Sequence, residues 1–104
     1  MPREKFQTLT EQMFYTLLCL RRPRCGADIM ERARSMTAGR VVIGPGTLYA
    51  LLDTFLGQGW IGELPPEGRK RRYRLTPAGE ARLAAEVRRL KCQLEDYDRM
   101  GGAE

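Results

Sequence analysis

The chain has 104 residues, enough for one compact domain with a modest core. With 42% apolar residues and a net charge of +5, its composition excludes a disordered chain and suits a polyanionic partner such as nucleic acid. No apolar run approaches the roughly 18 residues of a membrane span, and the charged start is not that of a secretory signal. We therefore expect a cytoplasmic protein that does not enter a membrane.

The first helix is expected to begin after Thr10, which is a suitable N-cap, and to end before Pro23. Residues 1–8 are expected to be a frayed lead-in, with Phe6 touching the core. The basic residues around Pro23 complement the dipole at the end of this helix, so we interpret them first as a solvated cap and only second as phosphate contacts.

A second helix is predicted over residues 26–36, with Ile29, Ala33 and Met36 on its apolar stripe. The β-branched run at residues 40–43 is predicted to be a short strand segment that leads into the next turn.

A third helix is predicted from Pro45, because proline is pre-set for the first helical position. It is expected to stop at Gly57 and Gly59, which reach the left-handed cap conformation cheaply. Its apolar face comprises Leu48, Leu51, Leu52, Phe55 and Leu56. The other face is small and polar, and its glycine-rich start favours close approach to an anion. The alternative is an ordinary amphipathic core helix.

A basic hairpin follows. Residues 60–64 are predicted to form one strand, residues 65–68 the turn and residues 69–75 the return strand. Strand alternation places Tyr73 and Leu75 on one face of the return strand, whereas Arg72 and Arg74 lie on the other.

The last predicted helix starts after Thr76 and reaches about Met100, and the tail beyond it is expected to be disordered. Its apolar residues are spaced four, three, four and three apart: Leu83, Val87, Leu90, Leu94 and Tyr97. Such a seam needs a partner, and a second copy of the chain is the simplest one. The alternative is that this helix folds back on its own core. We divide the chain at residue 76, with a dimerisation helix and tail at 77–104.

Three helices, a basic hairpin and a long helix are the order of a winged helix-turn-helix domain with an added dimerisation helix. The predicted fold is thus mainly α with a small β-hairpin, and residues 1–76 form the DNA-binding part. The candidate DNA contacts are Gly46, Thr47, Tyr49 and Ala50 on the helix front and Arg69, Lys70, Arg71 and Arg72 on the wing. The alternatives are that Tyr49 is a half-buried support for the wing, and that the wing is only a solvated hairpin.

Several stretches resemble the PadR family of bacterial transcription regulators over about residues 9–97. They are Leu9-Thr10-Glu11 with Phe14-Tyr15 and Leu17-Leu18, Gly26 with Ile29, Gly44-Pro45-Gly46-Thr47-Leu48-Tyr49 with Leu52, Gly59 with Ile61, and Gly68-Arg69 through Tyr73, Leu75-Thr76 and Gly79. The chain departs from the family where Cys25-Gly26-Ala27 stands in place of the frequent His-Gly-Tyr, and the last helix has no tryptophan.

The resemblance implies a homodimer that binds an inverted-repeat operator, usually as a repressor, with release by a small molecule in some members. It also implies that the last helix packs on the partner's first helix, which adds Phe14 to the expected dimer interface. The missing tryptophan means that the flat-drug site of certain multidrug-responsive members is not carried over. An effector site at the dimer interface remains an expectation without a defined ligand.

No chemistry of an enzyme is apparent. The chain has no histidine, so the commonest general base is absent, and its three cysteines have no metal-binding spacing. No cofactor or metal is expected. The alternative function, from a different class, is a helical dimeric protein-interaction module that does not bind DNA.

Overall fold

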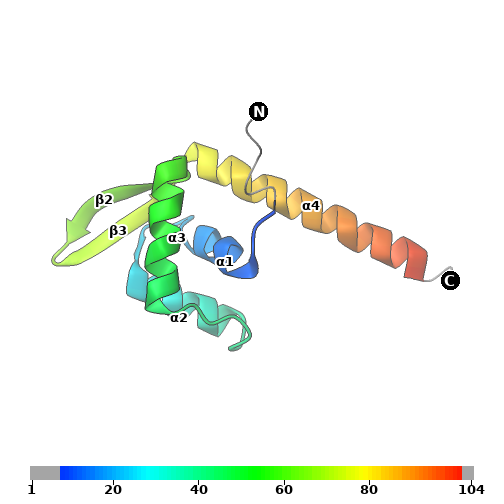
Figure 1. Ribbon diagram of the computed structural model, residues 1–104, viewed down its shortest axis with the longest axis horizontal. Helices are drawn as coiled ribbons and strands as arrows, with labels where there is room; N and C mark the ends of the chain where they lie inside the picture. The colour runs from blue at the N-terminus through cyan, green and yellow to red at the C-terminus, as the bar shows by residue number, and fades with distance from the viewer. Residues whose placement is uncertain (1–7, 102–104) are drawn as a thin grey trace.

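The computed structural model describes residues 8–101. The expected lead-in with Phe6 and the expected disordered tail lie outside the described residues. The elements in chain order are α1 (Glu11–Cys19), β1 (Arg24–Cys25), α2 (Gly26–Met36), α3 (Pro45–Gln58), β2 (Ile61–Glu67), β3 (Lys70–Leu75) and α4 (Pro77–Gly101). Figure 1 shows α1, α2 and α3 gathered on one side of the long α4, with the β2–β3 hairpin projecting from the end where α4 begins.

The first three helices form the core. Thr10 caps α1 as predicted, since its hydroxyl oxygen accepts a hydrogen bond from the Met13 N–H at 3.1 Å. In these helices and at the end of α1, the largest apolar side chains that are almost completely buried are Leu17, Leu20, Ile29, Leu48, Leu52 and Phe55. Their burial removes the apolar faces of the amphipathic helices from water, which is the main stabilising term of the domain.

The predicted strand at residues 40–43 is wrong. This segment is an irregular loop between α2 and α3, and no strand lies beside it. Val41 and Ile43 are instead buried in the core, at 5% and 3% exposure. The β-branched residues therefore reflect burial of alternate side chains rather than pairing in a sheet.

Helix α3 begins as predicted, with Gly44 as the N-cap and Pro45 in the first turn. It ends at Gly59, which has a φ of 76° and closes the helix in the left-handed conformation. Gly57 was also expected to stop the helix, but it lies inside the last turn. One left-handed cap is sufficient to end the helix.

The sheet is antiparallel with the strand order β1-β3-β2. The turn predicted at residues 65–68 is wrong, because β2 continues through Pro65 and Pro66 and the chain reverses at Gly68 and Arg69. Proline is tolerated there since β2 is an edge strand, and the pairing is irregular between Leu64 and Glu67. The short β1, which pairs with β3 on its other side, was not predicted from the sequence.

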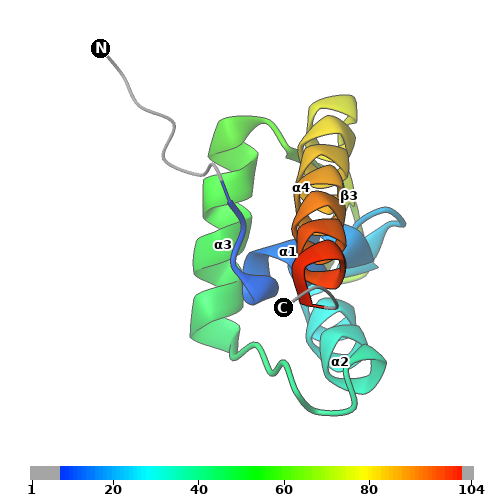
Figure 2. The same ribbon diagram turned by 90° about the vertical axis from the view of Figure 1, so that its right-hand side faces the viewer.

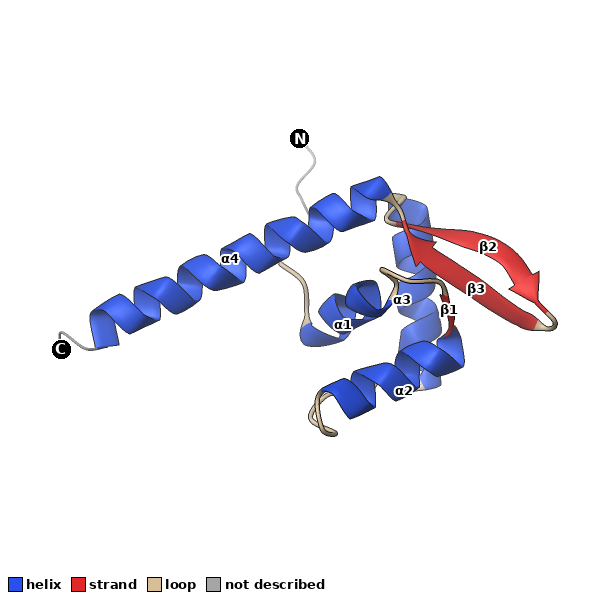
Figure 3. Cartoon of the chain, turned by 180° about the vertical axis from the view of Figure 1, so that it is seen from behind, coloured by secondary structure: helices blue, strands red, loops and turns tan. Residues whose placement is uncertain are grey.

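Helix α4 has two different halves. The Thr76 hydroxyl accepts from the Gly79 N–H at 3.1 Å, and Gly79, Leu83 and Glu86 are buried against the domain. Every residue from 90 to 101 is exposed, and Figures 1 and 3 show this half of α4 extending away from the other helices. Figure 2 shows α1 next to α4, and Phe14 of α1 and Glu86 of α4 line one groove. Among the described residues, no helix has the length and apolarity needed to cross a membrane.

Candidate DNA-binding surface

The front of α3 is exposed at its N-terminal end. Gly46, Thr47, Tyr49 and Ala50 all lie on the surface, and the opposite face of the helix supplies Leu48 and Leu52 to the core. A Cβ atom built on Gly44 or Gly46 would meet no atom within 4 Å, so this end of the helix is open to solvent. The N–H groups of a first helical turn attract anions, and this turn of α3 lies at the surface.

Tyr49 lies between α3 and the start of α2. Its side chain is 50% exposed, and a Cβ atom on Gly26 would lie only 3.1 Å from its hydroxyl oxygen. Glycine at position 26 thus allows the ring to rest close to the α2 backbone. One side of Tyr49 therefore packs on the domain, and the other side faces solvent.

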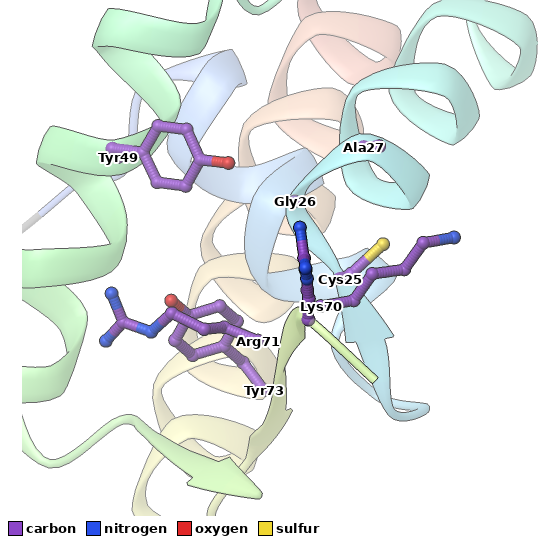
Figure 4. Close-up of a pocket in the computed structure, with 8 residues that line it drawn as sticks. Cys25, Gly26, Ala27, Tyr49, Lys70, Arg71 and Tyr73 are labelled. Atoms are coloured by element: carbon purple, nitrogen blue, oxygen red, sulfur yellow. The ribbon is translucent and has the colours of Figure 1, made fainter. Parts of the chain in front are cut away.

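A cavity of about 260 Å³ separates α3 from the hairpin (Figure 4). Its lining comprises Cys25, Gly26 and Ala27 from the start of α2, Tyr49 from α3, and Arg69, Lys70, Arg71 and Tyr73 from the wing. The structure therefore brings Tyr49 and three of the four predicted wing residues around one hollow. The fourth, Arg72, does not line it.

The wing cations differ in their partners. Arg71 donates two hydrogen bonds to the Glu63 carboxylate at 2.8 and 2.9 Å and lies 5.7 Å from the centre of the Tyr73 ring. Arg72 donates to the Pro65 carbonyl oxygen at 3.2 and 3.4 Å. Within residues 8–101, Arg69 and Lys70 have no ion-pair partner. The latter two are therefore the wing cations most available to an external anion.

The Glu63 carboxylate remains charged, because the hydrogen bonds from Arg71 hold its pKa below the ordinary value. The same pair raises the pKa of Arg71 above its usual range. The two charges largely cancel, and in Figure 4 the Arg71 side chain extends toward α3 whereas Lys70 extends the other way. Arg71 is therefore better placed to stabilise the hairpin than to bind a phosphate.

The residues of the expected dimer seam differ in how far they are buried. Leu83 is 3% exposed and belongs to the core of its own chain, which corrects its expected place in the interface. Val87 is half-buried, and Leu90, Leu94 and Tyr97 are 42%, 60% and 73% exposed. The outer three form an apolar stripe that nothing in the described chain covers. The inner part of the helix thus folds back on the core, as the alternative held, and the outer part does not.

Beside this stripe, α1 and α4 form a smaller groove of about 140 Å³. Phe14, the remaining predicted interface residue, lines it together with Leu90, and the Phe14 ring meets that of Tyr15 edge to face at 5.2 Å. The groove also contains the buried Glu86 and its partner Arg89. The predicted interface residues Phe14 and Leu90 therefore lie together in space.

Sequence reasoning missed two parts of the surface. The start of α2 lines the cavity, and the only signal for it was the stretch Cys25-Gly26-Ala27, noted as a departure from the family pattern. The Glu63 partner of Arg71 was also missed, because only strand register brings the two side chains together. No cluster of metal-binding side chains is found within residues 8–101.

A three-helix core with a hairpin wing beside an exposed helix front defines the winged helix-turn-helix class of DNA-binding domain. Solved structures agree with this fold. A transcriptional regulator from Clostridium thermocellum is 21% identical with a TM-score of 0.72, over 86% of this chain and 90% of that one. A PadR-like transcription factor from Bacteroides fragilis is 22% identical with a TM-score of 0.69, over 86% and 87%. RosR of H. salinarum is 25% identical with a TM-score of 0.64, over 88% and 79%.

The sequence profile described as the transcriptional regulator PadR-like family matches residues 16–85, which is more than half of the chain. The chain therefore belongs to the PadR-like family of transcriptional regulators, which bind DNA and are not enzymes. The resemblance noted from the sequence is confirmed. No curated protein gives a significant match.

Proposed function

We propose that this regulator binds an inverted-repeat operator as a homodimer in the bacterial cytoplasm and represses transcription from it. The observation that carries the proposal is that Tyr49 of the α3 front, the start of α2 and the wing cations Arg69 and Lys70 line one cavity. Neither cation has an ion-pair partner within residues 8–101. Such a surface combines the start of a helix with exposed cations, and helix N–H groups and cations are the groups that bind a phosphate backbone.

Within this proposal the wing residues position the protein, and the front of α3 reads the sequence. Thr47 and Tyr49 are exposed residues with hydroxyl groups, and Gly46 and Ala50 leave room for the duplex to approach. Arg69 and Lys70 meet flanking phosphates, whereas Arg71 and Arg72 contribute less because they have partners within the hairpin. Phosphate contacts fix register and orientation without carrying sequence information.

Residues 77–104 supply the dimer contact in this proposal, through Val87, Leu90, Leu94 and Tyr97 of α4 with Phe14 of α1. The exposed apolar stripe supports it, because an apolar helix face left in water is unfavourable and a second copy covers it by symmetry. The groove between α1 and α4 is the proposed place for a small-molecule effector, where one acts.

The test measures how DNA affinity depends on salt. Replacing Arg69 and Lys70 by alanine should weaken binding to operator and to scrambled DNA alike, because phosphate contacts do not depend on sequence. Each lost phosphate contact should change the slope of log affinity against log salt by about 0.9. With two subunits we expect the slope to flatten by about two to four units. Fluorescence anisotropy at several salt concentrations measures it, with the operator selected from genomic fragments by the purified protein.

The matched control replaces Arg88 and Lys91, two cations of α4, which removes the same charge away from the wing. Its slope should stay close to that of the wild type. An unaltered slope for the wing variant on both DNAs would show that the hairpin is only solvated. A wild type that binds no DNA at low salt would favour the protein-interaction module instead.

A further inference from the structure

The loop that leads into α3 is tied to the first turn of α1. Arg40 Nη1 donates to both carboxylate oxygens of Glu11 at 2.7 Å, and Nη2 donates to the Tyr15 hydroxyl at 3.2 Å. Beside it, Gln12 Nε2 donates to the Val42 carbonyl oxygen at 3.3 Å. These contacts, which we call the Arg40 clamp, join segments almost thirty residues apart in the chain.

The clamp directly follows two residues of the loop that have positive φ values. Ala38 and Gly39 have φ values of 53° and 83°, and alanine adopts the left-handed region only at a cost. After this reversal, Arg40 is the first residue whose own side chain attaches the loop to another helix. Four residues later the chain reaches Gly44, the N-cap of α3.

The position of the loop determines the position of the DNA-facing end of α3. Val41 and Ile43 hold the loop from the inside, in the core, and the Arg40 clamp holds it from the surface. Gly46 and Thr47, in the first turn of α3, follow directly. A recognition element has to be held to within about half an ångström, so both attachments matter for binding.

We propose that Arg40 is a positioning residue, which sets the pose of the DNA-facing end of α3 by clamping its lead-in loop to Glu11 and Tyr15. The inference rests on the proposed function for its DNA readout. An exposed ion pair contributes little to the stability of the fold, so the effect of the clamp is on geometry.

Replacement of Glu11 by glutamine gives the sharpest test, because a positioning role and a purely electrostatic effect predict opposite changes in affinity for the operator. The variant loses a negative charge, so electrostatics alone should tighten DNA binding. The positioning role predicts instead that affinity for the selected operator falls by about three- to thirty-fold, the range found for residues that couple to a site without touching the ligand. Affinity for scrambled DNA should not fall.

A matched control exists in α2. Glu31 accepts from Arg34 at 2.8 Å, and the side chains are 62% and 54% exposed, against 64% and 55% for Glu11 and Arg40. Both control residues lie on one helix, so this pair clamps nothing. Glu31→Gln has the same charge change and should not weaken operator binding. Equal effects of Glu11→Gln and Glu31→Gln would overturn the proposal.

A charge swap separates positioning from direct contact with DNA. Arg40→Glu alone should weaken operator binding, and adding Glu11→Arg should restore most of the affinity because the ion pair forms again in reverse. If Arg40 itself contacted a phosphate, the second substitution would not restore binding, and the proposal would be wrong.

Hydrogen exchange tests the clamp without DNA. The Arg40 N–H donates to the Thr37 carbonyl oxygen at 3.1 Å and the Val41 N–H donates to the Thr37 hydroxyl at 3.0 Å, so we expect both amides to be protected from exchange. Their exchange should accelerate in Glu11→Gln and not in Glu31→Gln. Unchanged exchange in Glu11→Gln would overturn the positioning role of Arg40. A wild type that binds no DNA would overturn the proposed function alone.

Discussion

Gly79 shows how one residue joins the wing to the last helix. A Cβ atom at this position would lie 2.0 Å from the Trp60 carbonyl oxygen and 2.8 Å from a Leu75 methyl carbon. The Trp60 carbonyl also accepts the Thr76 N–H at 3.0 Å, and the Thr76 hydroxyl donates to the Gly59 carbonyl oxygen at 2.6 Å. Only glycine lets the first turn of α4 approach this backbone, which explains the glycine that closes the Tyr-x-Leu-Thr-x-x-Gly stretch.

Gly79→Ala should therefore destabilise the protein by about 1–3 kcal/mol or more, as expected for an added group in a packed site. Thermal unfolding followed by circular dichroism measures it. The control is Gly57→Ala in α3, where a Cβ atom meets nothing within 4 Å. That change should stabilise by about 0.5–1 kcal/mol, because alanine favours a helix interior over glycine. Equal effects of the two substitutions would contradict the packing account.

At the scale of elements, α4 is one helix with two environments. Its inner half ends near Glu86, whose side chain is 2% exposed and accepts hydrogen bonds from Arg89. The Arg89 hydrogen bonds lower the pKa of this carboxyl, against the opposing effect of burial, and the Leu9 N–H lowers it further. Glu86 thus ties α4 to the segment that precedes α1.

Because the folded-state pKa of Glu86 is below its unfolded value, its stabilisation is present above the ordinary glutamate pKa and is lost as pH falls through the lowered value. Glu86→Gln should cost about 1–3 kcal/mol at pH 7, the range for a charge-assisted hydrogen bond. The difference from the wild type should shrink as pH approaches 3. Urea unfolding at several pH values checks this, with the exposed Glu95→Gln as control. A difference that stays constant with pH would contradict it.

At the scale of the whole molecule, the outer half of α4 carries an exposed apolar stripe. Leu90, Leu94 and Tyr97 follow one another on a single face and are exposed in the isolated chain. Their four-and-three spacing is that of a coiled-coil seam. Because these side chains are exposed, they contribute little to the stability of a single chain. Most of their apolar area is removed from water only when a second copy packs on them.

We predict a dimer in solution by light scattering at micromolar concentration. Replacing Leu90 and Leu94 by alanine should shift it to monomer, since each leucine buried in an interface contributes about 2–5 kcal/mol. The secondary structure of the monomer should be retained because both residues lie outside the core. The control substitutes Cys92 and Glu95, off the seam, and should remain dimeric. A monomeric wild type would show that the seam has another partner.

Local chemistry by itself determined much of this protein. Thr10 and Thr76 predict two helix starts and Pro45 a third, since caps and proline act on their own first turn. The apolar spacing predicts the buried face of α3, and alternation predicts that Tyr73 points inward. The exposed front of α3 and the basic wing follow from the same periodicities. These features depend on residues a few positions apart.

Tertiary structure alone decided the rest, because the deciding partners are distant in sequence. Strand β1 exists only because β3 lies beside it, and β2 runs through two prolines only because it is an edge strand. Leu83 and Leu90 have the same place in the heptad pattern, yet the domain covers the first and leaves the second exposed. Similarly, Arg71 and Lys70 look alike in sequence, but strand register gives Arg71 a carboxylate partner and leaves Lys70 without one within residues 8–101.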